Sequence, residues 1–356
     1  MFADVFHGRR VLVTGHTGFK GSWLTLWLTE LGAEVMGVAL EADTSPNHWQ
    51  LLELNHTKQK ITDIRDGDAV TNIVSNFKPE IVFHLAAQPL VRRSYLDPIE
   101  TWSTNVMGAA NVLEACRQVD TVKAIVVVTS DKCYENRGLS RGYRETDTLG
   151  GHDPYSASKA ATELVVDSYR RSYFNDAGIL VATARGGNVI GGGDWAEDRL
   201  IPDLVRSIDN QQSLEIRSPL STRPWQHVLD VLSGYLMLGQ QLYQGNNNLA
   251  RAWNFGPEPA SNLQVEHILL KLKSYWPAIE WHINHDVQPH EAHLLYLDNS
   301  DVKAELGWRP LWELDETLSI TAQWYQQYLS SAIAISSQQL QDYISCAKSS
   351  QSQWCH

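Results

Sequence analysis

The chain has 356 residues, of which 43% are hydrophobic and 20% are charged, and its formal net charge is −12. That length predicts about two domains, and the acidic balance disfavours nucleic acid or an anionic membrane as the main partner. No run approaches the ~18 consecutive apolar residues of a membrane span, and no apolar signal segment follows the opening "MFADVFHGRR", so we expect a cytoplasmic protein. The four cysteines form no CxxC pair and the histidines lack metal-ligand spacing, which predicts neither disulfides nor a metal site.

The first half of the chain alternates short apolar runs with longer helical patterns. The apolar runs predict strands at residues 9–14, 34–40, 80–86, 122–129 and 178–185. Helical patterns separate them at residues 21–32, 68–77, 105–119 and 155–175. Apolar runs without polar alternation are typical of strands that are covered on both faces. The pattern therefore predicts an α/β fold with a Rossmann-type, doubly wound parallel sheet.

The pattern becomes irregular after about residue 188. Helices are expected near residues 200–210, 228–243, 260–276 and 298–308, between loops rich in Gly, Pro and Asn. We expect residues 1–188 to form a dinucleotide-binding domain. Residues 189–330 are expected to form mainly a smaller substrate-binding domain, with some segments returning to the sheet. Residues 331–356 are rich in Ser and Gln and predict a tail with a weak helix and a frayed end.

The stretch "VLVTGHTGFKGSWL" has three glycines between the first strand and the first helix. Gly15 permits a tight turn, Gly18 lets the backbone approach a pyrophosphate, and Gly21 lets the helix pack closely against the strand. The helix N-terminus then faces the phosphates. The turn predicts a dinucleotide-binding site whose other members are Thr17, Phe19 and Lys20.

The GxxGxxG spacing resembles that of the extended short-chain dehydrogenase/reductase family. An acid at the end of the second strand, Glu41 with Asp43 as its rival, would bind the adenosine ribose and favour NAD over NADP. The resemblance implies that Asp63 and Ile64 contact adenine, and that Asn105 lies near the nicotinamide half. It also implies further cofactor contacts at two strand ends, from Leu85, Ala86, Ala87, Gln88 and Thr129.

The stretch "DPYSASKAATEL" contains a YxxxK pair, Tyr155 and Lys159, which share one face of a helix because they lie four residues apart. Lys159 would lower the pKa of Tyr155 and bind the nicotinamide ribose. The phenolate can then take a proton from a substrate hydroxyl while NAD accepts the hydride. Ser130 matches the hydroxyl partner that relatives have beside the reacting oxygen.

Asp131 and Lys132 follow Ser130 directly. In sugar-nucleotide 4,6-dehydratases of this family two titratable residues stand there, Asp-Glu in the dTDP-glucose enzymes, whereas the epimerases lack the pair. The lysine, together with "TGHTGFKGSW" and "AAQPLVRRSY", resembles the branch that acts on CDP-D-glucose. Over about residues 8–330 the resemblance implies a lyase that forms CDP-4-keto-6-deoxy-D-glucose and water. Such a step feeds the synthesis of deoxyhexoses for surface polysaccharides such as O-antigen.

A 4,6-dehydration needs an acid and a base besides Tyr155, because the C4 ketone acidifies the C5 hydrogen and the C6 hydroxyl must leave as water. We expect Asp131 to be the acid, with a pKa raised by a dry site. Lys132 is the expected base at C5, with a pKa lowered by burial and by Lys159. Lys132 has two other interpretations: it stays charged and stabilises the enolate, or it forms only a structural ion pair with Asp131 or Glu135.

The resemblance also implies the substrate contacts and the assembly. Asn188 and Arg223 would contact the diphosphate, and Arg93 and Ser94 would contact the hexose. Arg217, with His290 or Glu291, would contact the nucleotide. Relatives pair through the helices at residues 105–119 and 155–175, which implies a homodimer, and pairing into a tetramer stays open. Two other functions stay open as well: a related enzyme, such as a 4-epimerase or a dehydratase for a different sugar nucleotide, and a non-catalytic NAD-binding protein.

Overall fold

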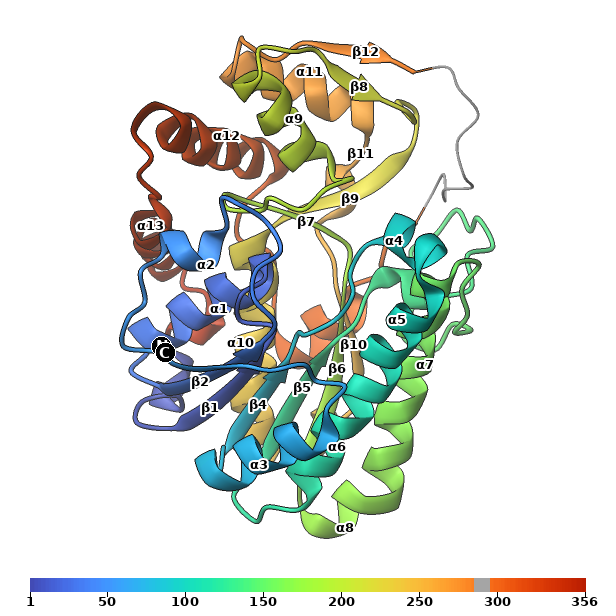
Figure 1. Cartoon of the computed structure of the whole chain (residues 1–356), viewed down its shortest axis with the longest axis vertical. Helices are drawn as coiled ribbons and strands as arrows, with labels where there is room; N and C mark the ends of the chain where they lie inside the picture. The colour runs from blue at the N-terminus through green and yellow to red at the C-terminus, as the bar shows by residue number, and fades with distance from the viewer. Residues whose placement is uncertain (285–294) are drawn as a thin grey trace.

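The computed structural model describes residues 1–284 and 295–356, and these residues form two lobes (Figure 1). In this part of the chain, seven parallel strands build the sheet of the larger lobe in the order β10-β6-β5-β4-β1-β2-β3. The strands are β1 (Arg10–Thr14), β2 (Glu34–Ala39), β3 (Lys58–Ile61), β4 (Ile81–His84), β5 (Ala124–Val128), β6 (Leu180–Gly186) and β10 (Ala252–Phe255). The predicted doubly wound parallel sheet is confirmed.

Helices cover both faces of this sheet (Figure 1). On one face lie α1 (Phe19–Glu30) and α10 (Val228–Tyr243), and on the other lie α3 (Gly67–Phe77), α6 (Gly108–Arg117) and α7 (Pro154–Tyr169). Side chains of β5 alternate between the two cores: Val126 packs on the α1–α10 side, and Ile125 and Val127 on the other. Because both faces are buried, the strands are continuous apolar runs in the sequence.

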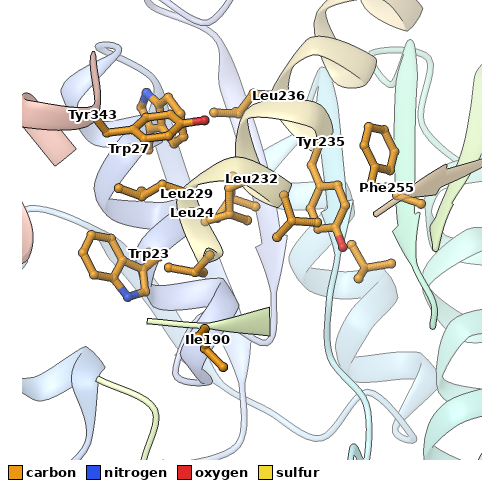
Figure 2. Close-up of a cluster of buried hydrophobic side chains, with 14 of the residues drawn as sticks. Trp23, Leu24, Trp27, Ile190, Leu229, Leu232, Tyr235, Leu236, Phe255 and Tyr343 are labelled. Atoms are coloured by element: carbon orange, nitrogen blue, oxygen red, sulfur yellow. The ribbon is translucent and has the colours of Figure 1, made fainter. Parts of the chain in front are cut away.

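The core on the α1–α10 side is rich in aromatic rings (Figure 2). Trp27 of α1 packs edge-on against Tyr343 with ring centroids 5.6 Å apart. Tyr235 of α10 meets Phe255 of β10 in the same way at 5.5 Å. Each large apolar side chain buried here contributes about 1.5–3 kcal/mol relative to exposure. This layer therefore anchors α1, and with it the glycine-rich turn, to the sheet.

The C-terminal tail belongs to the same core. One face of α13 (Ser336–Ser349) is buried, and Trp354 beyond it stacks on Phe2 with centroids 5.1 Å apart. The backbone N–H of Ala3 donates to the His356 carbonyl at 2.8 Å, so the two termini lie side by side (Figure 1). The expected frayed end is therefore wrong, because the few apolar residues of the tail find partners at the opposite end of the sequence.

The smaller lobe contains two short sheets and several helices. Its elements are β7 (Asn188–Ile190), β9 (Thr222–His227) and β11 (Asn262–Gln264) in one sheet, β8 (Leu214–Ile216) and β12 (Trp281–Ile283) in another, and the helices α9 (Leu200–Asp209), α11 (Val265–Tyr275) and α12 (Leu314–Ser331). Between these segments α10 and β10 return to the larger lobe, where β10 pairs with β6. The helix expected at residues 298–308 is a shorter helical turn at Val302–Leu306.

The edge strand β3 has no counterpart in the sequence prediction. Its residues, KQKI, are all exposed and lack an apolar pattern. The strand forms through backbone pairing with β2, and its two lysines discourage pairing with other chains.

Candidate active site

The glycine-rich turn after β1 meets the turn after β4 at the point where the strand order reverses. Gly15 has φ +78°, and a Cβ there would lie 2.7 Å from the backbone N of Ala86, while a Cβ on Gly21 would collide with the Gly15 carbonyl. The residue before α1 is Gly18, and no side chain in the described ranges caps this helix. The open N–H groups and the close backbone approach fit a dinucleotide pyrophosphate.

On the adenosine side, the Thr17 hydroxyl donates to the Leu40 carbonyl at 2.9 Å and ties the turn to the end of β2, next to the exposed Glu41. Asp43 is exposed as well, and its carboxylate lies 3.9 Å from the Arg93 guanidinium. Asp63 accepts hydrogen bonds from Arg65 at 2.8 and 2.5 Å, and these bonds hold the pKa of Asp63 below its usual range. Ile64 is buried against Gly108 of α6. Their contacts with the cofactor stay predictions.

On the nicotinamide side, Asn105 lies in the helical turn η2 (Ser103–Met107) and is buried. Its amide bridges two elements: Oδ1 accepts from the Gln88 N–H at 2.8 Å, and Nδ2 donates to the Gln88 carbonyl at 3.1 Å and to Ser158 Oγ at 2.8 Å. Thr14 Oγ1 accepts from the N–H groups of Leu85 and Ala86 at 3.2 Å each. The turn from Leu85 to Gln88, Ala87 included, is thereby fixed against β1 and α7.

Tyr155 and Lys159 project from the first turns of α7, which Asp153 caps by accepting from the Ser156 N–H at 2.9 Å. Both side chains are buried. Burial raises the pKa of Tyr155 to about 12, opposed by a hydrogen bond with the Ser130 side chain. Burial lowers the pKa of Lys159 to about 8. The predicted Ser-Tyr-Lys group is thus brought together.

Arg199 also influences Tyr155, and no motif in the sequence pointed to it. It precedes α9 and pairs with the buried Asp194 at 2.9 Å. The pKa of Tyr155 depends most on burial, then on the Ser130 hydrogen bond and on the charge of Asp131. The charge of Arg199 is the next influence, and it lowers the pKa of the phenol. The positive charge of Arg199 therefore favours the ionised form of the phenol.

Asp131 lies in the short turn η3 (Asp131–Cys133), directly after β5, and is 3% exposed. Burial raises its pKa, while Lys132, the Ser130 hydroxyl and Arg223 act in the opposite direction. Ser130 Oγ donates to Asp131 Oδ1 at 2.9 Å. A carboxyl group with a raised pKa beside the hydroxyls of Ser130 and Tyr155 is suited to donate a proton.

Lys132 is half-buried in the same turn, and its backbone N–H donates to Ser130 Oγ at 3.2 Å. Its charge lowers the pKa of Asp131, so the two side chains are neighbours. Glu135, one partner considered for Lys132, accepts hydrogen bonds from Arg137 at 3.1 and 2.5 Å instead. The choice between base and electrostatic stabiliser stays a prediction.

The predicted diphosphate ligands lie on neighbouring strands. Asn188 of β7 is opposite Trp225 of β9, and Arg223 on β9 is buried and close enough to lower the pKa of Asp131. Gly187 directly precedes Asn188, and a Cβ on Gly187 would lie 2.8 Å from Pro224 and 3.5 Å from Asp131 Oδ2. The structure therefore brings the strand of Arg223 to the predicted acid.

The other predicted substrate residues are engaged elsewhere. In α4 (Val91–Leu96), Arg93 forms two hydrogen bonds with Glu100 at 2.9 and 2.7 Å, and the buried Ser94 donates to the Val91 carbonyl. Arg217 pairs with Asp198 at 3.1 Å, and Arg92 approaches the same carboxylate at 3.6 Å. His290 and Glu291 lie outside the described residues.

The site is cationic although the chain is acidic. Burial, and then the charges of Arg199 and Lys159, lower the pKa of Lys20 to about 8, whereas Asp131 and Asp194 act in the opposite direction. Five basic side chains thus surround two carboxyl groups: Lys20, Lys132, Lys159, Arg199 and Arg223. Such a balance suits two diphosphates, one of a dinucleotide and one of a sugar nucleotide.

The loop of residues 191–194, which carries Asp194 and so fixes Arg199, is packed tightly. A Cβ on Gly192 would collide with the Trp324 ring, and Trp23 Nε1 donates to the Gly192 carbonyl at 2.9 Å. The Tyr325 hydroxyl donates to the Asp194 carbonyl at 2.6 Å. The consecutive glycines therefore serve close approach to α12 and α1.

Two further observations concern the described ranges as a whole. No group of three or more His, Cys, Asp or Glu in residues 1–284 and 295–356 is arranged to hold a metal ion. In the same ranges, no helix combines the length and the apolar character that crossing a membrane requires.

A parallel doubly wound sheet, a glycine-rich turn at its switch point and a buried Ser-Tyr-Lys group define a dinucleotide-dependent enzyme of the short-chain dehydrogenase/reductase type. Residues 12–321 match the family model described as GDP-mannose 4,6 dehydratase, and the chain belongs to this family.

The chain is similar to two proteins named as glucose 4,6-dehydratases and to one protein solved with UDP-glucose and NAD. It is 51% identical over 333 residues to the CDP-glucose 4,6-dehydratase of Salmonella typhimurium, a match that covers 92% of this chain and 93% of the relative. The solved structure of MoeE5 in complex with UDP-glucose and NAD has a TM-score of 0.75 and 25% identity, over 90% of this chain and 99% of that one. The dTDP-glucose 4,6-dehydratase DesIV of Streptomyces venezuelae, solved with NAD, has a TM-score of 0.76 and 24% identity, over 89% and 97%.

Proposed function

We propose that this protein converts CDP-D-glucose into CDP-4-keto-6-deoxy-D-glucose and water. It is an NAD-dependent sugar-nucleotide 4,6-dehydratase, a hydro-lyase. The observation that carries the proposal is the buried Asp131, which joins Tyr155 through Ser130 and neighbours Lys132. An acid and a base are needed for elimination of water but not for simple epimerisation at C4. The 51% identity to a CDP-glucose 4,6-dehydratase supports CDP-D-glucose as the substrate.

The chain's own residues bind the cofactor and handle the protons. Bound NAD would supply the hydride chemistry, as acceptor of the hydride from C4 of the sugar and as its donor to C6. The turn from Gly15 to Gly21 would hold the pyrophosphate, Glu41 the adenosine ribose and Lys159 the nicotinamide ribose. Tyr155 takes the proton of the C4 hydroxyl, which leaves a ketone at C4.

The elimination then uses Lys132 and Asp131. The ketone acidifies the C5 hydrogen, and the side chain of Lys132 removes it as a proton. Asp131 donates its proton to the C6 oxygen, which leaves as water. Lys132 returns a proton to C5 when the hydride arrives at C6.

The proton balance closes through Ser130. After one cycle Tyr155 carries one proton more and Asp131 one fewer than at the start. The Ser130 hydroxyl is hydrogen-bonded to both side chains, donating to Asp131 at 2.9 Å, so it offers a path by which the proton moves from the phenol to the carboxylate. NAD is likewise restored, and no external reductant is required.

Turnover of four sugar nucleotides tests the proposal. The protein is incubated with the CDP, dTDP, UDP and GDP derivatives of glucose, and the products are identified by mass and by their 4-keto-6-deoxy chromophore. We expect a product lighter by one water from CDP-glucose, formed faster than from the other three. A C4 epimer of unchanged mass would contradict the proposal, and so would no turnover of any substrate.

We further propose a homodimer formed through the helices around α6 and α7. Large apolar side chains are exposed there: Leu96, Ile99, Met107 and Leu164 are 87%, 75%, 57% and 62% exposed. Exposed large apolar side chains on neighbouring helices favour a protein interface. Sedimentation of the full chain is expected to give a dimer or a multiple of it, and a monomer at micromolar concentration would contradict this.

We also propose that the enzyme works in the cytoplasm, on a route to deoxyhexoses for O-antigen. The four cysteines are free, which suits a reducing compartment. The Salmonella relative supports this setting. Loss of deoxyhexose from the surface polysaccharide after gene deletion is the expected result, and an unchanged polysaccharide would contradict it.

A further inference from the structure

A buried ion pair lies behind the catalytic side chains, and none of the steps above uses it. Glu163 of α7 and Arg185 of β6 are 2.8 Å apart, with side chains 3% and 4% exposed. Glu163 follows Lys159 by four residues and Tyr155 by eight, so the three side chains share one face of the helix.

The Glu163 carboxylate accepts three hydrogen bonds. Oε1 accepts from Thr129 Oγ1 at 2.5 Å, and Oε2 accepts from Thr183 Oγ1 at 2.7 Å and from the Arg185 guanidinium at 2.8 Å. Thr129 directly precedes Ser130, so its bond fixes the end of β5 from which Ser130 and the following acid-base pair project.

Arg185 carries the connection to the turn η3. Its NH1 donates to the Tyr134 hydroxyl at 2.6 Å, and that hydroxyl donates to Asn254 Oδ1 at 2.7 Å. Tyr134 is the residue that ends η3, the turn formed by Asp131, Lys132 and Cys133. One buried pair therefore touches the helix of Tyr155 and Lys159, the strand end of Ser130, and the turn of Asp131 and Lys132.

The charge of Glu163 also reaches Lys159. Burial would raise the pKa of Glu163, but Arg185 and the hydrogen bonds outweigh burial and hold that pKa below its usual range, so Glu163 is ionised. Burial lowers the pKa of Lys159 to about 8, and Glu163 is the first influence that opposes this. Without the carboxylate, Lys159 would lose its proton at a lower pH.

We propose that Glu163 is a positioning residue of the active site, which holds the segments of Tyr155, Ser130 and the acid-base pair in register through Thr129 and Arg185. The inference rests on the proposed dehydratase activity, since elimination requires that side chains from all three segments reach the same sugar. Its charge keeps Lys159 in the form that binds a ribose and stabilises a phenolate.

The variant Glu163→Gln keeps the size of the side chain and removes its charge. We expect turnover of CDP-glucose to fall by as much as about 100-fold, because small displacements of reacting groups are costly, while KM changes little. The descending limb of the pH–rate profile should move to lower pH, because Lys159 deprotonates earlier. The matched control is Asp167→Asn, one turn further along α7, where Asp167 pairs with Arg170 and Arg171 at 2.8 and 2.9 Å. Its turnover and pH profile are expected to match wild type.

A purely structural role is separated by a second variant. Glu163→Gln leaves Arg185 buried and unpaired, which destabilises the fold strongly, so the double variant Glu163→Gln/Arg185→Met removes both charges. We expect its melting temperature to recover toward wild type while turnover and the pH profile stay as in Glu163→Gln. NAD titration by tryptophan fluorescence provides a readout independent of turnover, and we expect weaker binding in both variants.

The outcomes separate this inference from the proposed function. A folded double variant with wild-type turnover and wild-type pH profile would overturn the positioning role alone. If the double variant does not fold, the variant Glu163→Asp tests the role, because it retains the charge on a shorter side chain. We expect the descending limb of its pH profile to return to the wild-type position while turnover stays low. Wild-type values for both turnover and the pH profile would overturn the positioning role. Wild-type protein that turns over no sugar nucleotide would overturn the proposed function instead.

Discussion

The predicted catalytic edge of the larger lobe differs from two predicted substrate arginines, Arg93 of α4 and Arg217 of the smaller lobe, in how the charged groups are held. Ser130, Tyr155 and Lys159 are buried and come from one strand end and one helix. Arg93 and Arg217 are half-exposed, and each pairs with a carboxylate of this chain, at 2.7 and 3.1 Å. The first set is held in place by burial, whereas each arginine of the second would have to leave a protein carboxylate before it could bind a substrate phosphate or sugar.

The largest effect is expected at the predicted catalytic edge. In the proposed mechanism, Tyr155→Phe removes the group that takes the C4 proton, and general acid–base groups contribute typically about 100- to 10,000-fold to rate. We therefore expect turnover of CDP-glucose to fall by that range with the circular dichroism spectrum unchanged. Turnover within about tenfold of wild type would show that another group accepts the proton.

The acid and the base can be separated by isotope exchange. Asp131→Asn cannot protonate the C6 oxygen, so water loss should fall by roughly 100-fold or more, while Lys132 still exchanges the C5 hydrogen with deuterated solvent. Lys132→Ala should lose both the elimination of water and the exchange of the C5 hydrogen. Undiminished deuterium at C5 with near-normal turnover in Lys132→Ala would exclude Lys132 as the base.

Arg223 lies between the two regions, because it belongs to the smaller lobe but is buried beside Asp131. Arg223→Ala should raise KM for CDP-glucose roughly 10- to 100-fold, since charge-assisted hydrogen bonds contribute about 1.5–3 kcal/mol. Steady-state kinetics measure this. An unchanged KM with a reduced rate would mean that Arg223 serves the acid rather than the diphosphate.

Variants of Arg199 test whether a residue of the smaller lobe affects the ionisation of Tyr155. The charge of Arg199 lowers the pKa of Tyr155, so Arg199→Met raises that pKa, and the ascending limb of kcat/KM should move to higher pH. Arg199→Lys should restore most of the shift. An unmoved limb with a raised KM would assign Arg199 to substrate binding alone.

The smallest effect is expected at Asp198, which approaches both Arg217 and Arg92. Partly exposed pairs contribute about 0–1 kcal/mol, so Asp198→Asn should leave the melting temperature almost unchanged. Because Arg217 no longer has to leave a carboxylate, KM should fall, by at most about fivefold. A raised KM would mean that Asp198 holds Arg217 in its binding position.

The same contrast explains what the sequence could predict. The glycine-rich turn and the Tyr155–Lys159 pair are local patterns with a helical or turn period, so the fold and the catalytic edge were readable. Arg199 was not, because its position depends on how Gly192 packs under Trp324, far along the chain. Trp354 and Tyr343 of the tail likewise found their partners, Phe2 and Trp27, only in three dimensions. Glu163 follows the YxxxK pair at the same helical period, a signal that was present and was not used.

The position of solvent deuterium in the product tests the central claim most directly, namely that Asp131 and Lys132 carry out a 4,6-elimination after oxidation at C4. Wild-type protein is incubated with CDP-glucose in heavy water, and the product is examined by mass spectrometry and NMR. We expect a 4-keto-6-deoxy sugar that has lost the C6 oxygen and carries one deuterium at C5. A product that keeps the C6 oxygen, or one that carries no deuterium at C5, would contradict the account.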